Sequence, residues 1–222
     1  MHVTLTTHWT ITLLTLLTSH PRQEPPKVTR TVKDNVLTSI EKPAIGLKID
    51  KGFKYLGAQS FILYGVATAE QHFFVDADEN KQIKRLYWIQ FEGYLPDNKN
   101  TYRYQGKKKA SLGKFEFFAD AAARKSGPSS RPDSDSAMFM KFVKEKGYHM
   151  AEGDYLSQRL LHYLDDKRDE LMIIYLESLA PMQLTAADLA PTGKAAGQWE
   201  GIAEKLLQRT LKGMELVDEK AK

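Results

Sequence analysis

The chain has 222 residues, of which 42% are hydrophobic and 27% are charged, a composition typical of a folded globular protein rather than a disordered one. It contains no cysteine, which excludes disulfides, thiolate nucleophiles, Cys-ligated zinc and iron–sulfur clusters. The formal net charge of +4 is too small to indicate a nucleic-acid-binding protein by itself.

The first segment, residues 1–26, combines an apolar stretch from Ile11 to Leu17 with the proline-rich sequence PRQEPP. This order is typical of an export signal followed by a linker, and it predicts a protein of the periplasm or cell envelope. Against this, no Lys or Arg precedes Arg22 and threonines interrupt the apolar stretch. A cytoplasmic chain with a packed first strand or a misassigned start codon is the alternative. No other stretch approaches the roughly 20 apolar residues of a transmembrane helix, so we predict one domain over 27–222 without a membrane span.

The sequence from Pro43 to Ala121 has the β-branched and aromatic content of strands. Two runs, Val66–Val75 and Ile83–Leu95, flank the polar sequence DADENK and predict an antiparallel hairpin. Shorter strands are predicted at TYRYQG, which starts at Thr101, and over Gly113–Ala121. This half of the chain is therefore expected to form a meander.

A stretch rich in Ser, Pro and Gly, residues 124–136, predicts a surface loop. After it, Ser134 or Asp135 is a candidate N-cap for a short amphipathic helix near residues 135–146. Tyr155–Leu164 fits both a helix and a strand, and we predict a strand paired with Glu170–Leu179.

The last periodic stretch, residues 197–217, predicts a long C-terminal helix with apolar residues on one stripe. The predicted fold class is therefore α+β. It consists of a curved, mainly antiparallel sheet of about six strands, with a short inserted helix and a C-terminal helix packed on it.

The hairpin contains the candidate site. A turn centred on Glu79 places His72 opposite Leu86 and Glu70 opposite Trp88, and side chains then alternate between two faces. One face is apolar and is the expected core: Ala67, Ala69, Phe73, Val75, Tyr87, Ile89, Phe91 and Leu95. The other carries Thr68 and the six residues that we predict to bind a ligand: Glu70, His72, Trp88, Gln90, Glu92 and Tyr94.

An imidazole, two carboxylates, an amide and two amphipathic aromatics on one curved face favour a binding trough, in which Trp88 and Tyr94 form walls. We therefore predict a non-catalytic binding module for a small or amphipathic ligand, with no cofactor. A solvent-facing side of an antiparallel sheet would have a similar composition. Trp88 would simply be core if the C-terminal helix covered it.

Two other functional classes remain as alternatives. A hydrolase would use His72 as a base beside Glu70 and Glu92, and the same groups offer nitrogen and oxygen ligands to a metal. A nucleic-acid binder would use the tract from Tyr102 to Lys109, which interleaves tyrosines with basic residues. Common catalytic motifs are missing, and the loop beginning at Asp76 lacks the glycine and the final glutamate that an EF-hand requires.

Overall fold

The computed structural model describes residues 26–104, 108–127 and 131–217, and these parts of the chain form two sheets and two α-helices. The larger sheet has eight strands: β4 (Lys54–Leu63), β5 (Ala67–Ala77), β6 (Gln82–Tyr94), β7 (Lys108–Leu112), β8 (Phe115–Arg124), β9 (His149–Met150), β10 (Tyr155–Tyr163) and β11 (Asp169–Ser178). Their order is β4-β5-β6-β11-β10-β8-β7, and β9 pairs with β6 in parallel while all other pairs are antiparallel.

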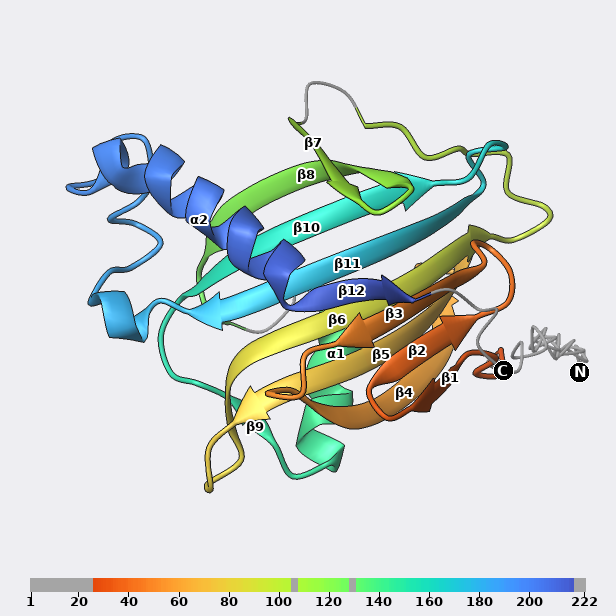
Figure 1. The fold of residues 1–222 in the computed structure, drawn as a ribbon, viewed down its shortest axis with the longest axis horizontal. Coiled ribbons are helices and arrows are strands. Elements are labelled where there is room, and N and C mark those ends of the chain that lie inside the picture. The colour runs from red at the N-terminus through yellow and green to blue at the C-terminus, as the bar shows by residue number, and fades with distance from the viewer. Residues whose placement is uncertain (1–25, 105–107, 128–130, 218–222) are drawn as a thin grey trace, which may run out of the picture.

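A second layer covers one face of this sheet. It contains a four-stranded sheet of order β1-β2-β3-β12 and the helix α2, which lies over β8 and β10 (Figure 1). The bounds are β1 (Thr31–Lys33), β2 (Val36–Ser39), β3 (Ile45–Ile49), α2 (Trp199–Lys212) and β12 (Met214–Val217), with short 3₁₀ helices at Ala180–Met182 and Ala196–Gln198. Leu37, Leu47 and Leu206 from this layer are fully buried against Ile89 and Ile173 of the large sheet.

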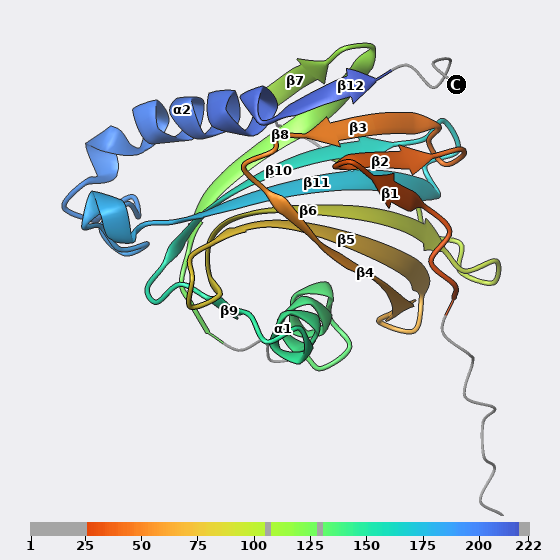
Figure 2. The same ribbon diagram turned by 60° about the horizontal axis from the view of Figure 1, so that its bottom comes forward.

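The helix α1 (Asp135–Glu145) lies on the opposite face of the large sheet, whose strands arch over it (Figure 2). Phe139, Phe142 and Val143 project from α1 into a second core that includes Phe73 and Trp88. Full burial of such side chains stabilises a fold by about 1.5–3 kcal/mol each. Both faces of the sheet are thus covered, which makes the molecule three layers thick.

The start of α1 is fixed by a side-chain cap. The Ser134 hydroxyl accepts a hydrogen bond of 3.1 Å from the Ala137 amide, and Asp135 places a negative charge in the first turn. Gly147, in the left-handed region at φ 75°, follows the helix. The structure confirms the predicted short helix in this position.

Removal of this cap gives a first testable prediction. Ser134→Ala is expected to lower the free energy of unfolding by about 1 kcal/mol, because the Ala137 amide would lose its acceptor. Urea denaturation measures this difference. Ser136→Ala, at an exposed position two residues further along the chain, is the control. It should change the free energy of unfolding by no more than about 0.5 kcal/mol. Equal stability of both variants would contradict the capping role.

The α+β class, the mainly antiparallel pairing and both helices match the prediction, whereas the single sheet of about six strands is wrong. The prediction missed β1, β2 and β12, and Thr101–Tyr104 is not a strand. The ambiguous stretch from Tyr155 is the strand β10, paired with β11 as expected. No helix in the described ranges is both long and apolar enough to span a membrane.

Two further predictions concern other parts of the chain. The predicted N-terminal segment, residues 1–26, lies outside the described residues except for Pro26. Within the predicted loop over 124–136, Lys125 to Gly127 are exposed, and residues 128–130 also lie outside the described parts.

The register of the β5–β6 hairpin corrects the prediction. Glu70 pairs with Phe91 instead of Trp88, and His72 pairs with Ile89 instead of Leu86, a displacement of three residues. Two of the three residues of displacement come from the turn. The Asp78 amide donates to the Gln82 carbonyl at 3.1 Å, so the loop is centred on Asn80 rather than on Glu79. The third comes from a bulge.

The bulge lies in β6 next to the turn. Asp76 pairs with Arg85 but Ala77 pairs with Ile83, so Lys84 is an extra residue on β6. An odd displacement exchanges the two faces of one strand relative to the other. The predicted separation into an apolar face and a polar face is therefore wrong.

Candidate functional site

The six predicted site residues lie on two different faces of the large sheet. Glu70 and His72 point toward the layer that contains the small sheet, together with Ile89 and Phe91. The other four point toward α1: Trp88, Gln90, Glu92 and Tyr94. The structure therefore does not bring the predicted set together, and their role in ligand binding stays a prediction.

Glu70 and His72 belong to a buried polar network. The Glu70 carboxylate accepts hydrogen bonds of 2.9–3.0 Å from both the backbone and the side chains of Thr29 and Arg30. His72 Nε2 lies 2.8 Å from Glu70 Oε1, and the Tyr55 hydroxyl lies 3.1 Å from His72 Nδ1. Desolvation opposes ionisation of Glu70, but the hydrogen bonds from His72, Thr29 and Arg30 outweigh it and lower its pKa to about 2.

This network ties Thr29 and Arg30, which precede β1, to the large sheet. His72 has 0% exposure and both of its ring nitrogens have partners within the protein. Glu92, which the hydrolase hypothesis places beside it, is on the other face of the sheet. These contacts are those of a histidine that holds structure, because no nitrogen is left to face a substrate.

A second polar cluster lies on the α1 face. Glu92 and Glu170 are directly opposite on β6 and β11, and both are desolvated. Tyr102 donates to Glu92 at 3.1 Å, and Tyr104 donates to Glu170. Burial raises the pKa of both carboxyl groups, and in Glu170 the nearby Glu92 raises it further.

The same cluster contains Tyr102 and Tyr104 of the tract from Tyr102 to Lys109, in which residues 105–107 lie outside the described parts. Tyr102 is buried and stacks on Tyr94 at 4.6 Å between ring centroids. Tyr104 packs against Phe118 and Tyr163. Both tyrosines thus already contact aromatic rings of the protein, and Tyr102 is too deeply buried to stack on a nucleic-acid base.

Gln90 extends this cluster toward α1. Its side-chain oxygen accepts hydrogen bonds of 2.7 Å from Trp88 Nε1 and from Gln71 Nε2, and its amide donates to Glu92. Gln59 in turn donates to Gln71 at 2.7 Å. The side-chain amides of the glutamines thus form hydrogen bonds with one another. Such bonds allow amide groups to be buried without a large desolvation cost.

Two cavities adjoin these clusters. The first, of about 210 Å³, lies beside residues 26–30 and is lined by Arg30, Lys42, Glu70 and Asp169 among others. Four of its charged side chains already have partners, since Arg30 pairs with Glu70 at 3.0 Å and Lys42 with Asp169 at 3.1 Å. A ligand would have to displace these ion pairs.

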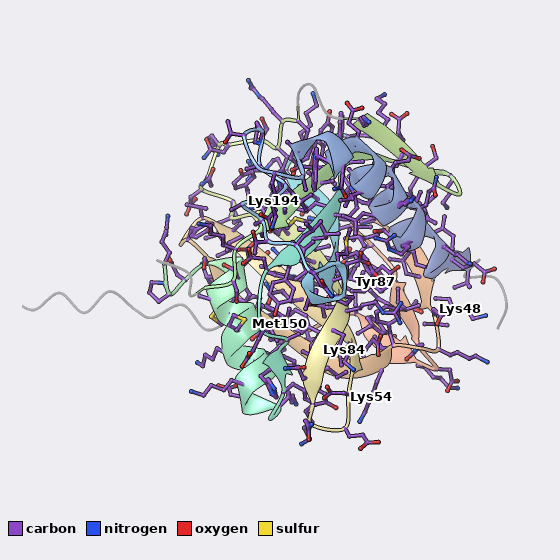
Figure 3. The ribbon with its side chains drawn as sticks, turned by 90° about the vertical axis from the view of Figure 1, so that its left-hand side faces the viewer. Lys48, Lys54, Lys84, Tyr87, Met150 and Lys194 are labelled. Atoms are coloured by element: carbon purple, nitrogen blue, oxygen red, sulfur yellow. The ribbon has the colours of Figure 1, made fainter. Side chains whose placement is uncertain are left out.

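The second cavity, of about 360 Å³, lies between α1 and strands β6, β11 and β10. We call it the α1 cavity. Figure 3 shows Met150, one of its lining residues, beside α1. Its walls are mainly apolar: Trp88, Phe139, Met140, Met150, Met172, Ile174 and Leu176. Of the six predicted site residues, only Trp88 lines it, and its ring stacks on Phe139 at 5.1 Å between centroids.

Polar side chains gather on the β10 and β8 side of the α1 cavity. Arg124 and Lys125 come from the end of β8, Ser157 and Arg159 from β10, and Asp135 from the start of α1. Burial raises the pKa of Asp135, although the neighbouring Arg159 and Arg124 oppose the rise. Three cationic side chains therefore face one carboxyl group whose negative charge is disfavoured.

The sequence analysis missed the residues of β10 and β11 that line the α1 cavity. Ser157 and Arg159 alternate with Leu156, Gln158 and Leu160, and this alternation places a charged and a hydroxyl side chain on one face of a strand. That signal was present in the sequence, but α1 and Trp88 are brought to the same face only by the fold.

Comparison of the chain with protein-family models, curated proteins and solved structures finds no match. The function is therefore inferred from the geometry of the chain's own residues.

Proposed function

We propose that this protein binds a small amphipathic molecule in the α1 cavity without changing it chemically. The observation that supports this most directly is the wall of seven apolar side chains around about 360 Å³, in contact with a few polar groups on one side. Pockets for small ligands in proteins are typically concave, mostly apolar and about 300–1,000 Å³ in volume. The α1 cavity lies at the lower end of that range, which favours a small ligand.

The composition of the wall fits this role. Met140, Met150 and Met172 contribute flexible, polarisable side chains, which adapt to ligands of irregular shape. Met140 is 42% exposed, and Arg124 and Lys125 are exposed as well, so the lining reaches the protein surface on this side. A ligand can therefore enter next to α1 without unfolding of the sheet.

The two buried polar networks offer a ligand fewer free hydrogen-bonding groups. The Glu70 network and the Gln90 network satisfy their own hydrogen-bonding groups, whereas no described residue fills the volume between the apolar walls of the α1 cavity. Filling that volume with apolar atoms gains dispersion contacts and removes apolar surface from water.

The proposal predicts binding of a neutral apolar probe. N-phenyl-1-naphthylamine, which fluoresces more strongly in apolar surroundings, is expected to bind the full-length protein with saturable enhancement. Ser157→Leu is expected to weaken this binding by about tenfold or more, because Ser157 lines the cavity and leucine would occupy part of its volume. Fluorescence titration measures both affinities.

Ser111→Leu is the matched control, since Ser111 is exposed on β7, away from the cavity. It should bind the probe as tightly as the unaltered protein. Thermal unfolding of all three proteins establishes that each is folded. Equal affinities for Ser157→Leu and Ser111→Leu, or no saturable binding at all, would refute the α1 cavity as the site.

A further inference from the structure

We infer that the ligand of the α1 cavity carries an anionic head group, a carboxylate on a short aliphatic chain, which Arg159 and Arg124 bind. This inference rests on the proposed function and adds the chemical class of the ligand. It is carried by the arrangement of cationic side chains on the β10 and β8 side of the cavity, opposite the apolar wall.

Arg159 has hydrogen-bonding capacity that the protein does not use. Its Nη2 donates to Asp120, the residue directly opposite on β8, but its buried Nε has no partner among the described residues. A guanidinium group has five N–H donors, and a buried donor without an acceptor destabilises the folded protein. A carboxylate oxygen at the edge of the cavity would supply acceptors to this guanidinium group.

The charges around Arg159 favour an anion over a cation. Arg124 and Lys125 also line the cavity, and neither forms an ion pair with another described residue. Asp120 already pairs with Arg159, and the side chain of Asp135 accepts a hydrogen bond from the Ser136 amide at 2.7 Å. The uncommitted charge at this side is therefore positive.

The positions along the strands orient the ligand. A cross-strand row runs from Phe73 through Trp88, Ile174 and Arg159 to Asp120. The row changes from aromatic to aliphatic to charged, so a molecule lying along it would place its chain against Trp88 and Ile174 and its head group at Arg159. The small volume limits the chain to a short or medium length.

The test compares three probes that share an octyl chain: octanoate, 1-octanol and octylammonium. Each displaces N-phenyl-1-naphthylamine from the full-length protein at neutral pH, and the displacement gives its affinity. Octanoate is expected to bind about tenfold more tightly than 1-octanol, and octylammonium more weakly than both. Equal affinities for octanoate and 1-octanol, or tighter binding of octylammonium, would overturn the inference.

A variant locates the head group. Arg159→Gln is expected to lower the affinity for octanoate by about tenfold or more and to leave that for 1-octanol unchanged. Arg209→Gln is the matched control: Arg209 also pairs with one carboxylate, Glu177, but does not line the cavity. Its affinity for octanoate should equal that of the unaltered protein. An equal loss in both variants would overturn the assignment of Arg159.

The two proposals fail in different ways. If the neutral probe binds and Ser157→Leu weakens it, the α1 cavity stands as the site, and equal displacement by octanoate and 1-octanol then removes only the anionic head group. If Ser157→Leu has no effect on the neutral probe, the cavity itself is not the site. Should Arg159→Gln fail to fold, the comparison of the three octyl probes on the unaltered protein still decides the inference.

Discussion

Glu70→Ala is expected to lower the free energy of unfolding by about 3–5 kcal/mol, the usual cost of removing one partner from a buried ion pair. Glu70 is 5% exposed and accepts hydrogen bonds from Thr29, Arg30 and His72. Its loss would leave the Arg30 guanidinium and His72 without their shared acceptor in a buried site. Denaturation with guanidinium chloride measures the change.

Asp76→Ala is the control for this prediction. Asp76 pairs with Arg85, but both side chains are partly exposed, so its loss should cost about 1 kcal/mol or less. A loss for Glu70→Ala as small as that for Asp76→Ala would show that the buried network does not hold Thr29 and Arg30 in place.

The lowered pKa of Glu70 makes the free energy of unfolding depend on pH, and the direction of the shift gives the sign of this dependence. Hydrogen bonds lower this pKa in the folded protein from 4.5 to about 2, so the unfolded chain binds the proton more readily. The contribution of Glu70 to stability is present above about pH 4.5 and is lost as the pH falls toward about 2. Denaturation curves of Glu70→Gln should therefore lack this part of the acid destabilisation.

Glu170→Gln is expected to stabilise the protein at about pH 8 by about 2 kcal/mol. Burial, together with the charge of Glu92, raises the pKa of Glu170 to about 9, and burial raises that of Glu92 to about 7. Carboxyl groups with a raised pKa keep their protons up to a higher pH in the folded protein than in the unfolded chain. The stability of the unaltered protein should therefore decline as the pH rises from about 4.5 toward 9.

Glutamine at position 170 removes the part of this decline that comes from Glu170, because it has no proton to lose, and it still offers an oxygen to the Tyr104 hydroxyl. Glu116→Gln is the control, since Glu116 is exposed and pairs only with Lys109 at the surface. Chemical denaturation at several pH values between about 5 and 9 tests the prediction. The same slope of stability against pH in Glu170→Gln and in the unaltered protein would contradict it.

The positions of the two hairpin strands could be predicted from the sequence, but their register could not. The alternation of apolar residues and the turn sequence DADENK correctly located both strands. The predicted faces were exchanged because Lys84 is a bulge, which adds an odd residue to the displacement of the register. A bulge at that position leaves no distinct pattern in the sequence. A one-residue insertion in the pairing was enough to send Glu70 and Trp88 to opposite faces.

A polar binding face on the hairpin also requires one side of the sheet to be exposed to solvent. In the structure both faces are covered, and Glu70, Gln71, His72 and Phe73 in a row are all buried. Polar residues on such a strand therefore indicate buried hydrogen-bond networks rather than a solvent-facing trough. The tryptophan was indeed covered, but by α1 rather than by the C-terminal helix that the sequence analysis considered.

The C-terminal stretch illustrates a different limit. Ile202, Leu206 and Thr210 follow helical spacing and are buried, as predicted, but Met214 begins a strand. The helix ends at Gly213, where a Cβ would lie 2.3 Å from the Tyr87 hydroxyl, while that hydroxyl donates to the Thr210 carbonyl at 2.7 Å. A tyrosine far away in the sequence thus requires glycine at position 213 and provides a hydrogen bond to the last turn of the helix, and no local sequence pattern indicates this contact.

The pairing of β12 with β3 joins segments from nearly opposite ends of the chain. During synthesis, the first three strands leave the ribosome long before their last neighbour exists, and until then one edge of β3 lacks a partner. Such a long-range closure is slow to form because nearly the whole polypeptide must first be brought together. The early strands therefore acquire their final neighbour only after residues 214–217 have been translated.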